Sequence, residues 1–168
     1  MIMDDKRIVI GLQRKDEKVF ELFYKQYKNL CYYVIFDIVK NEMNAEELLQ
    51  DSFIDAYTKI NTFDGKNFKA WFLKIAKNNA LDFYRKKNKI VLDEELLASE
   101  KSFDHDDSLI TDLRSVLNKD EFLVLMLCSL YDMKQKDIAA YMEKPEGTIS
   151  WLYKEAKTKA KKFLERSK

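Results

Sequence analysis

Basic, aromatic and amide side chains are interleaved between Lys69 and Lys89, in the stretch KAWFLKIAKNNALDFYRKKNK. Lysine and arginine can neutralise phosphates, aromatic rings can stack on unpaired bases, and asparagine can read a base edge with a donor and an acceptor. This combination suits single-stranded or melted nucleic acid. It is equally typical of an ordinary amphipathic helix with an aromatic core face and solvated lysines, so the stretch alone leaves both interpretations open.

The spacing of this stretch predicts a helix with two different faces. A largely apolar face is formed by Trp71, Phe72, Ile75, Ala76 and Asn79. Another face carries Lys74, Lys77, Asn78, Leu81 and Arg85. We predict Trp71 to be a core residue, because Phe72 and Ile75 share its face. The preceding residues NTFDGKNF (61–68) contain Gly65 and break the period, which predicts a loop.

Two further helices are predicted before this loop. Apolar residues recur at three- and four-residue steps from Val19 to Val39, and a second apolar stripe runs from Ala45 to Ile60. We expect Asn44 to cap the second helix, with Glu47 completing a capping box. The side opposite the stripe is polar and carries Glu46, Glu47, Gln50, Asp51 and Asp55.

The composition indicates a globular helical protein. Apolar residues make up 46% of the 168 residues, whereas Gly (3) and Pro (1) are too scarce for a β-rich fold. We therefore predict an all-α fold of two small helical domains. The net charge is +1, so nucleic-acid contact would depend on where the basic residues lie. The sequence has neither a signal peptide nor a membrane span, so we expect a cytoplasmic protein without membrane insertion.

An acidic segment without sustained period, from Lys89 to Ser108, separates the two predicted domains. The expected boundaries are residues 1–89 for the first domain, 90–108 for the linker and 109–168 for the second domain. The linker is either a soluble tether or a run of acids that occupies a basic channel of a partner. Both interpretations stay open at this point.

The second domain ends in a pattern typical of a helix-turn-helix. The short helix KQKDIAAYM is followed by the break EKPEG and a longer helix from Thr148 to about Leu164, for which Thr148 is the predicted N-cap. The residues spaced to pack the two helices together are Ile138, Ala139, Met142, Ile149 and Leu152. Many helical hairpins share this pattern. Upstream, Asn118 and Glu121 predict another capping box.

No enzyme signature is present in the sequence. The single histidine, His105, lies in the linker, and there is no Cys–His cluster, Walker lysine or nucleophile elbow. The acids of the second helix lack the Glu-x-x-His pairs of a di-iron bundle. Cys31 and Cys128 lie far apart in apolar runs, as is typical of buried free thiols in a reducing cytosol. We expect no enzymatic activity, no metal and no cofactor.

Three segments carry a family pattern in this order: NAEELLQDSFIDAYTKINTFDG, FKAWFLKIAKNNALDFYRKK and DIAAYMEKPEGTISWLYKEAK. Together they resemble the extracytoplasmic-function (ECF) group of the sigma-seventy family. The resemblance implies a bacterial RNA polymerase subunit. Its sigma-two domain would bind the β′ clamp helices of core RNA polymerase and melt the minus-ten element. Its sigma-four domain would bind the duplex minus-thirty-five element and the β flap, and the linker would thread the polymerase cleft. An anti-sigma factor is a further candidate partner, and the expected location is the bacterial cytoplasm, at the nucleoid.

The resemblance also implies three sets of binding residues. Those for minus-ten DNA are Asp64, Lys66, Phe68, Lys74, Lys77, Asn78, Arg85, Lys86 and Lys87. Those for core polymerase are Glu47, Gln50, Asp51 and Asp55. Those for minus-thirty-five DNA are Thr148, Ser150, Trp151, Lys154 and Lys157. In this family the loop before the third helix helps to capture a flipped base, and Asn78 matches a position close to that base.

The chain departs from the family pattern in its second domain. Glu143 stands where glycine is common, and Trp151, Leu152 and Glu155 stand where small polar or basic residues are common. The base contacts of that helix therefore do not carry over. Two rival functions remain: a helix-turn-helix regulator that acts without polymerase, and a sigma-like module that only titrates a partner. Co-elution with core polymerase and promoter-directed transcription would separate them.

Overall fold

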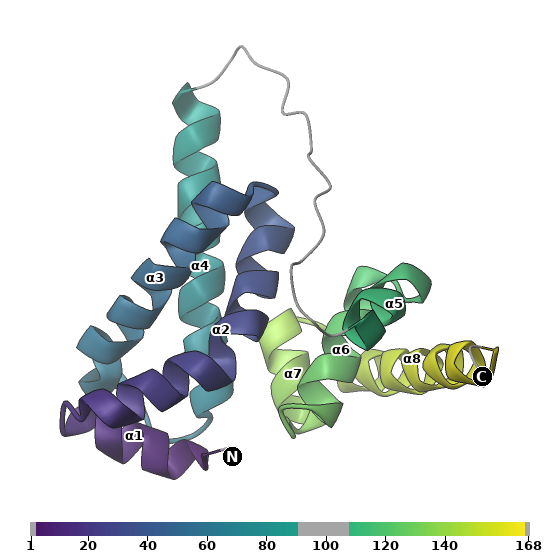
Figure 1. The fold of residues 1–168 in the computed structure, drawn as a ribbon, viewed down its shortest axis with the longest axis horizontal. Coiled ribbons are helices and arrows are strands. Elements are labelled where there is room, and N and C mark those ends of the chain that lie inside the picture. The colour runs from purple at the N-terminus through teal and green to yellow at the C-terminus, as the bar shows by residue number, and fades with distance from the viewer. Residues whose placement is uncertain (1–2, 91–107, 167–168) are drawn as a thin grey trace. The chain divides into compact units, whose positions relative to one another are not determined.

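The computed structural model describes residues 3–90 and 108–166, and every regular element in these ranges is a helix (Figure 1). The predicted all-α fold is confirmed. The chain divides into two compact units, and the predicted acidic linker falls almost entirely on residues 91–107, which lie outside the described ranges. Each unit is described by itself. None of the described helices combines the length and apolar character that a membrane span needs.

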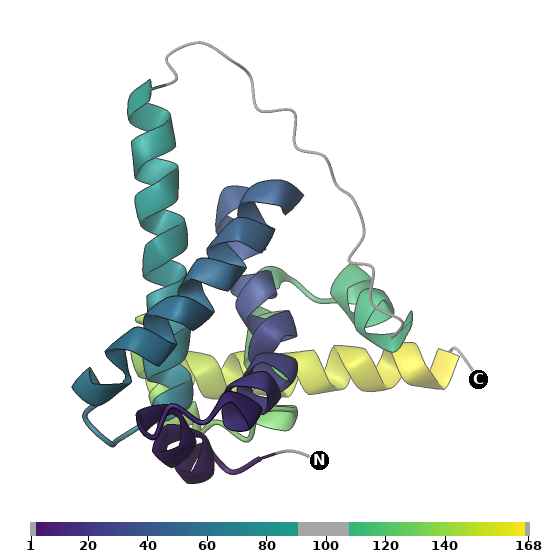
Figure 2. The same cartoon turned by 60° about the vertical axis from the view of Figure 1, so that its left-hand side comes forward.

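The first unit contains α1 (Asp5–Gln13), α2 (Glu17–Val39), α3 (Glu42–Lys59), the short helix η1 (Ile60–Thr62) and α4 (Phe68–Ile90). Helices α2, α3 and α4 pack against one another, and α1 packs against α2. In both views the last turns of α4 extend beyond α2 and α3 (Figures 1 and 2). The last turns of α4 therefore project beyond the packing of these three helices.

Aromatic rings fill the centre of this three-helix packing. The ring of Phe23 on α2 lies 4.7 Å from that of Phe53 on α3 and 4.8 Å from that of Phe72 on α4, measured between ring centroids. All three side chains are almost completely buried. Edge-to-face and tilted arrangements of this kind add to the hydrophobic stabilisation. The predicted stripe from Ala45 to Ile60 is buried as expected, with only Tyr57 partly exposed.

Two features hold helix α1 in place: the close packing of Gly11 against α2, and the contacts of the Asp5 carboxylate. A Cβ atom added to Gly11 would lie 2.6 Å from the Cβ of Val19, so only glycine permits this approach of α1 to α2. The Asp5 carboxylate accepts a hydrogen bond from the Tyr27 hydroxyl (2.7 Å) and pairs with the Lys69 ammonium (3.5 Å). Asp5 thereby joins α1 to both α2 and α4.

The connection between α2 and α3 differs from the prediction. Lys40 adopts a left-handed conformation (φ 52°) that ends α2, and Asn41, not Asn44, caps α3. The Asn41 side chain accepts a hydrogen bond from the backbone N–H of Asn44 at 3.0 Å. The predicted Asn44 cap is wrong because the turn is only two residues long, so Asn44 already lies in the first helical turn and its N–H needs an acceptor.

The second unit contains α5 (Ser108–Val116), α6 (Lys119–Ser129), α7 (Gln135–Met142) and α8 (Glu146–Arg166). Helix α8 packs against α5, α6 and α7. The predicted contact residues Ile138, Ala139, Ile149 and Leu152 are buried, and Met142 is partly exposed. The predicted helix-turn-helix packing is therefore present.

Helix α7 ends at Met142 as predicted, whereas the start of α8 departs from expectation. Helix α8 begins at Glu146, and the Pro145 carbonyl accepts hydrogen bonds from the backbone N–H groups of Thr148 (3.0 Å) and Ile149 (3.2 Å). Thr148 therefore lies within the first turn and is not the N-cap that was predicted. The fixed φ of proline preorganises this earlier start. Glu143 ends α7 in a left-handed conformation (φ 56°), which glycine adopts without steric cost.

The two cysteines are free thiols, as predicted, although only Cys31 is fully buried and Cys128 is partly exposed. Burial raises the pKa of both thiols, and a hydrogen bond with Ser52 partly opposes this effect on the pKa of Cys31. Neither environment favours the reactive thiolate.

The predicted capping box at α6 is confirmed, and one of its two residues, Glu121, is a buried acid. Asn118 and Glu121 exchange hydrogen bonds between side chain and backbone (2.9 and 3.0 Å). Glu121 is 1% exposed, and its carboxylate accepts a 2.6 Å hydrogen bond from the Lys159 ammonium on α8. Burial raises the pKa of Glu121, but the hydrogen bonds from Lys159 and Asn118 and the charge of Lys159 outweigh it. The pKa is therefore below its ordinary value.

We expect Lys159→Met to destabilise the second unit by about 1–2 kcal/mol near neutral pH, because it removes a donor from a buried carboxylate. The folded-state pKa of Glu121 lies below 4.5, its ordinary value, so the stabilisation is complete above pH 4.5 and disappears as the pH falls through the folded-state pKa. The stability difference between variant and wild type should therefore shrink on acidification.

Urea unfolding followed by circular dichroism, at neutral pH and below pH 4.5, measures this difference. Lys161→Met is the matched control, because Lys161 lies on the same helix and pairs with the exposed Glu165 at 3.9 Å. A stability difference that is unchanged by acidification would contradict the assigned role of Glu121.

Candidate nucleic-acid interface

Helix α4 positions the side chains that were predicted to contact melted DNA. The Asn67 side chain accepts a 2.9 Å hydrogen bond from the backbone N–H of Ala70 and so holds the first turn. Sequence reasoning missed this role, although an asparagine directly before a periodic apolar run is a known signal. One stripe of α4 is buried in the first unit and consists of Phe68, Phe72, Leu73, Ala76 and Ala80. The opposite side of the helix is left for solvent.

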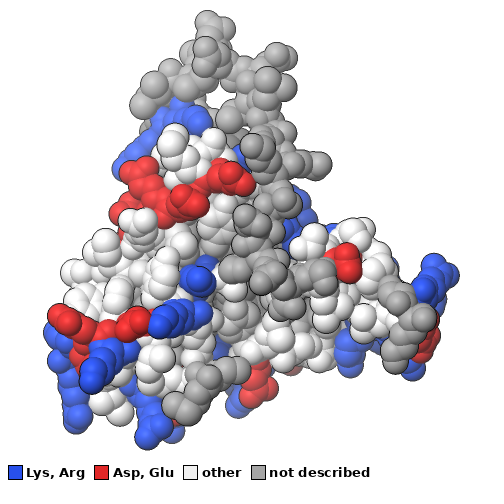
Figure 3. All heavy atoms as spheres, in the orientation of Figure 1, with Lys and Arg blue, Asp and Glu red and all other residues white. Residues whose placement is uncertain are grey.

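That opposite side carries the predicted basic and amide residues. Lys74, Asn78, Arg85 and Lys86 are exposed, whereas Lys77 and Lys87 are partly exposed. Asp82 lies 3.4 Å from Arg85, but both groups are well exposed, so this ion pair adds little stability and does not hold Arg85 away from a ligand. Figure 3 shows basic side chains at the upper left of the view, just below the grey atoms, where Figure 1 shows the projecting end of α4.

Trp71 differs from its prediction as a core residue. Its side chain is only partly buried, and its ring packs against Phe63 (5.4 Å) and Phe68 (5.9 Å) at the edge of the aromatic cluster. Phe72, one position later, occupies the centre instead. The reason is that the buried stripe follows positions 68, 72, 76 and 80, so position 71 lies at its margin.

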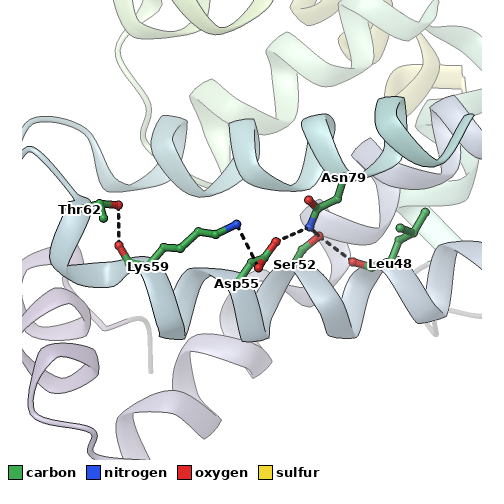
Figure 4. Close-up of polar contacts among 6 residues, drawn as sticks. All are labelled: Leu48, Ser52, Asp55, Lys59, Thr62 and Asn79. Atoms are coloured by element: carbon green, nitrogen blue, oxygen red, sulfur yellow. Dashed lines mark hydrogen bonds and ion pairs between the residues drawn. The ribbon is translucent and has the colours of Figure 1, made fainter. Parts of the chain in front are cut away.

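The two adjacent asparagines of α4 have different environments. Asn78 is exposed, whereas the Asn79 amide nitrogen donates to the Asp55 carboxylate at 3.1 Å and to the Ser52 hydroxyl at 3.3 Å (Figure 4). The other Asp55 oxygen pairs with Lys59 at 3.1 Å. Asp55, predicted to contact polymerase, is therefore partly buried and engaged within its own unit.

This polar bridge joins α3 to α4 beside the aromatic core. The Ser52 hydroxyl donates in turn to the Leu48 carbonyl at 2.6 Å, so the half-buried polar groups have partners (Figure 4). Hydrogen bonds need defined directions, whereas apolar packing tolerates small rotations of a helix. The bridge therefore helps to set the rotation of α4 about its axis. With Asn79 turned toward α3, the preceding residue Asn78 faces solvent.

The loop before α4 is held by its own side chains. The Asp64 carboxylate accepts a 3.1 Å hydrogen bond from the backbone N–H of Lys66, and Gly65 between them has a φ of 81°. Asp64 and Lys66 are exposed, as a DNA contact requires. Phe68 is 3% exposed and packs in the aromatic core, so its predicted DNA contact is not available in this structure. It begins the buried stripe of α4, which explains the difference.

Helix α3 presents a mixed acidic and apolar face on the same unit. The predicted residues Glu47, Gln50 and Asp51 are exposed. Met43 and Ile54, at three- and four-residue steps from them, are 74% and 58% exposed. Sequence reasoning missed these two, although both lie outside the apolar stripe of α3. Large exposed apolar side chains beside charges are typical of a protein-binding surface.

In the second unit, the first turns of α8 are open to solvent. Thr148, Ser150, Trp151, Lys154 and Lys157 are all exposed, as the minus-thirty-five prediction requires. The Ser150 hydroxyl donates to the Gln135 side chain at the start of α7, which links the two helices of the motif. The Lys157 ammonium lies 4.3 Å from the centroid of the Tyr153 ring. Within the described residues no cluster of His, Cys, Asp and Glu side chains could hold a metal ion.

Residues 23–90, which comprise most of α2 and all of α3 and α4, match the family model for sigma-70 region 2. The chain is 31% identical to the ECF RNA polymerase sigma factor SigX of Bacillus subtilis over 105 residues, which cover 54% of each chain. It is 25% identical to the RNA polymerase sigma-H factor of Pseudomonas aeruginosa over 165 residues, which cover 86% of each chain. The match with SigX thus spans only about half the length of that relative.

A solved structure shows the same fold. The sigma factor RpoE of Bartonella quintana, in its co-crystal structure with the anti-sigma factor NepR, aligns with a TM-score of 0.56 and 23% identity. The alignment covers 88% of this chain and 98% of RpoE. At this identity the likeness concerns the fold alone, whereas the region 2 match and the sequence relatives concern the family. These matches show that residues 23–90 are similar to sigma-70 region 2 and that the chain is similar to several ECF RNA polymerase sigma factors.

Proposed function

We propose that this chain is a promoter-recognition subunit of bacterial RNA polymerase, which binds the core enzyme and directs promoter-specific initiation. The observation that carries the proposal is the sigma-70 region 2 match over residues 23–90. That segment holds both surfaces of the first unit, the acidic and apolar face of α3 and the basic and amide face of α4. The protein is not an enzyme by itself and works in the cytoplasm, at the nucleoid.

Each surface has a proposed partner. The α3 face binds the β′ clamp helices, with Met43 and Ile54 as apolar contacts and Glu47, Gln50 and Asp51 as polar contacts at the rim. Apolar side chains supply most of such binding energy, whereas exposed charges set the association rate and the choice of partner. Asp55 supports this face from within, because its carboxylate is already bonded to Asn79 and Lys59.

Helix α4 is proposed to bind the melted minus-ten element. Asn78 and the exposed loop residues Asp64 and Lys66 contact an unpaired base, while Lys74, Lys77, Arg85, Lys86 and Lys87 contact the phosphate backbone. The second unit binds the duplex minus-thirty-five element through α8 and contacts the β flap. The linker, residues 90–108, is proposed to thread the polymerase cleft. An anti-sigma factor is a further proposed partner, because the related RpoE was solved with one.

Purified core polymerase tests this function against its rivals. We expect the chain to co-elute with the core enzyme and to direct run-off transcription from a subset of genomic fragments. Specific duplex binding without core association would favour a helix-turn-helix regulator that acts alone. Core association without transcription from any fragment would favour a module that only titrates polymerase.

Reversing charge on α3 should weaken core binding. Glu47→Lys combined with Asp51→Lys is expected to lower the affinity for core polymerase several-fold, mainly through slower association, because rim charges steer encounter more than they hold the complex. Both side chains are exposed, so helicity should not change. Surface-plasmon resonance at two salt concentrations measures the effect.

Glu21→Lys is the control for this change, since Glu21 is an exposed acid of α2 that pairs with Lys25 on the same helix. Equal affinity of the double variant and the control variant would contradict the assignment of the α3 face.

A further inference from the structure

Trp151 is the large apolar side chain that α8 presents to solvent at the start of the second motif helix. It is 57% exposed, whereas Ile149, Leu152 and Ala156 on the other side of α8 are buried. One turn further along its own side lies the exposed Lys154. One turn earlier, a Cβ added to Gly147 would meet nothing within 4 Å, so the surface at Gly147 is also open.

The surroundings of Trp151 match the charge of duplex DNA. Lys154, Lys157, Lys161 and Lys162 are exposed along α8, and Lys136 is exposed near the start of α7. Lysines on both helices can neutralise phosphates on either side of a major groove. Glu155, four residues after Trp151, is partly exposed, and phosphate would repel its carboxylate. Trp151 itself carries no charge to neutralise a phosphate, so its ring suits the base edges in the groove better than the backbone.

The chemistry of an indole ring selects among those edges. Tryptophan has one N–H donor and no acceptor, so it cannot accept hydrogen bonds from the amino groups of adenine or cytosine. Thymine alone presents a methyl group in the major groove, together with the O4 acceptor. We propose that Trp151 is a specificity-determining residue that recognises a thymine of the minus-thirty-five element by packing on its methyl group. This inference rests on the proposed function and names the base that α8 reads.

A methyl deletion on the DNA tests this contact directly. Holoenzyme is assembled from the full chain and core polymerase on a promoter found by run-off transcription. Each thymine of the minus-thirty-five element is then replaced in turn by uracil, which removes only the methyl group. We expect one position at which uracil weakens wild-type binding about fourfold, the effect of one buried methyl group. At that position Trp151→Ala should bind thymine and uracil templates equally.

Two further variants separate other roles of the side chain. Trp151→Phe keeps an apolar ring without the N–H donor and should retain the thymine preference. Lys154→Ala should weaken binding to both templates by the same factor, since phosphate contacts carry no base identity. Trp151 is exposed, so Trp151→Ala should keep the wild-type circular dichroism and melting temperature.

The outcomes that overturn the inference are distinct from failure of the proposed function. If the holoenzyme forms and initiates, but no uracil substitution discriminates wild type from Trp151→Ala, the inference is wrong. If no holoenzyme forms or no promoter is used, the proposed function is wrong, and the inference, which rests on it, is wrong as well.

Discussion

Phe72→Ala is expected to destabilise the first unit by about 3–5 kcal/mol, the cost of removing a large ring from a packed core. The Phe72 side chain is fully buried, and its ring lies 4.8 Å from both Phe23 and Phe53. The substitution therefore opens a cavity where α2, α3 and α4 meet. Since folded domains are stable by only about 5–15 kcal/mol, the substitution should remove a large share of the stability of the first unit.

Trp71→Ala is the matched comparison one residue away. Trp71 is only partly buried at the edge of the aromatic cluster, so its removal should cost clearly less than the Phe72 substitution. Urea unfolding of the full chain, monitored by hydrogen exchange of α2 amides, measures both variants. A larger loss for Trp71→Ala than for Phe72→Ala would mean that the packing of α4 is rotated from the one described.

Asn78→Ala is expected to relax base preference at one position of the minus-ten element by about tenfold or more. A lost bidentate base contact reduces discrimination by roughly 1–3 kcal/mol. Asn78 is exposed, so the change should leave stability unaltered. Transcription from a library of minus-ten variants, on duplex and on pre-melted templates, measures the preference.

Two neighbouring substitutions should behave differently. Arg85→Ala should weaken all library members alike and flatten the salt dependence, because a phosphate contact carries no base identity. Asn79→Ala removes the bridge to Asp55 and Ser52, so it should lower the stability of the first unit and weaken all promoters together. If Asn78→Ala instead scales every library member equally, the base reader must be the loop at Asp64–Lys66.

Regular features that depend on near neighbours in the sequence were predictable. The apolar stripes of α2 and α3 and the basic and amide face of α4 follow from a helical period that each segment carries by itself. The Asn118–Glu121 capping box is likewise a local exchange of hydrogen bonds across three residues, and the structure shows it as predicted. The resemblance to the sigma-70 family rests on the same local patterns, and residues 23–90 bear it out.

Helix starts were less predictable, because they depend on how the preceding chain ends. Asn41 and Asn44 are both suitable caps for α3, and the left-handed Lys40 decides between them because it ends α2 at Val39 and stands directly before Asn41. Thr148 is a suitable cap for α8, but Pro145 starts that helix sooner. Propensity alone does not distinguish such candidates, since each satisfies the same orphan N–H groups.

The amino-acid sequence by itself determined which residues of α4 are chemically able to bind melted DNA, because residue type and helical spacing are local properties. Only the tertiary structure decided how those residues are used. Packing against α2 and α3 buries Phe68 and leaves Trp71 at an edge, since a ring's exposure depends on neighbours distant in the sequence. The bonds from Asn79 to α3 likewise turn one asparagine inward and leave Asn78 in solvent. Residue type cannot predict which of these two adjacent asparagines faces inward, because their side chains are identical. The rotation of α4 relative to Asp55 and Ser52 decides it.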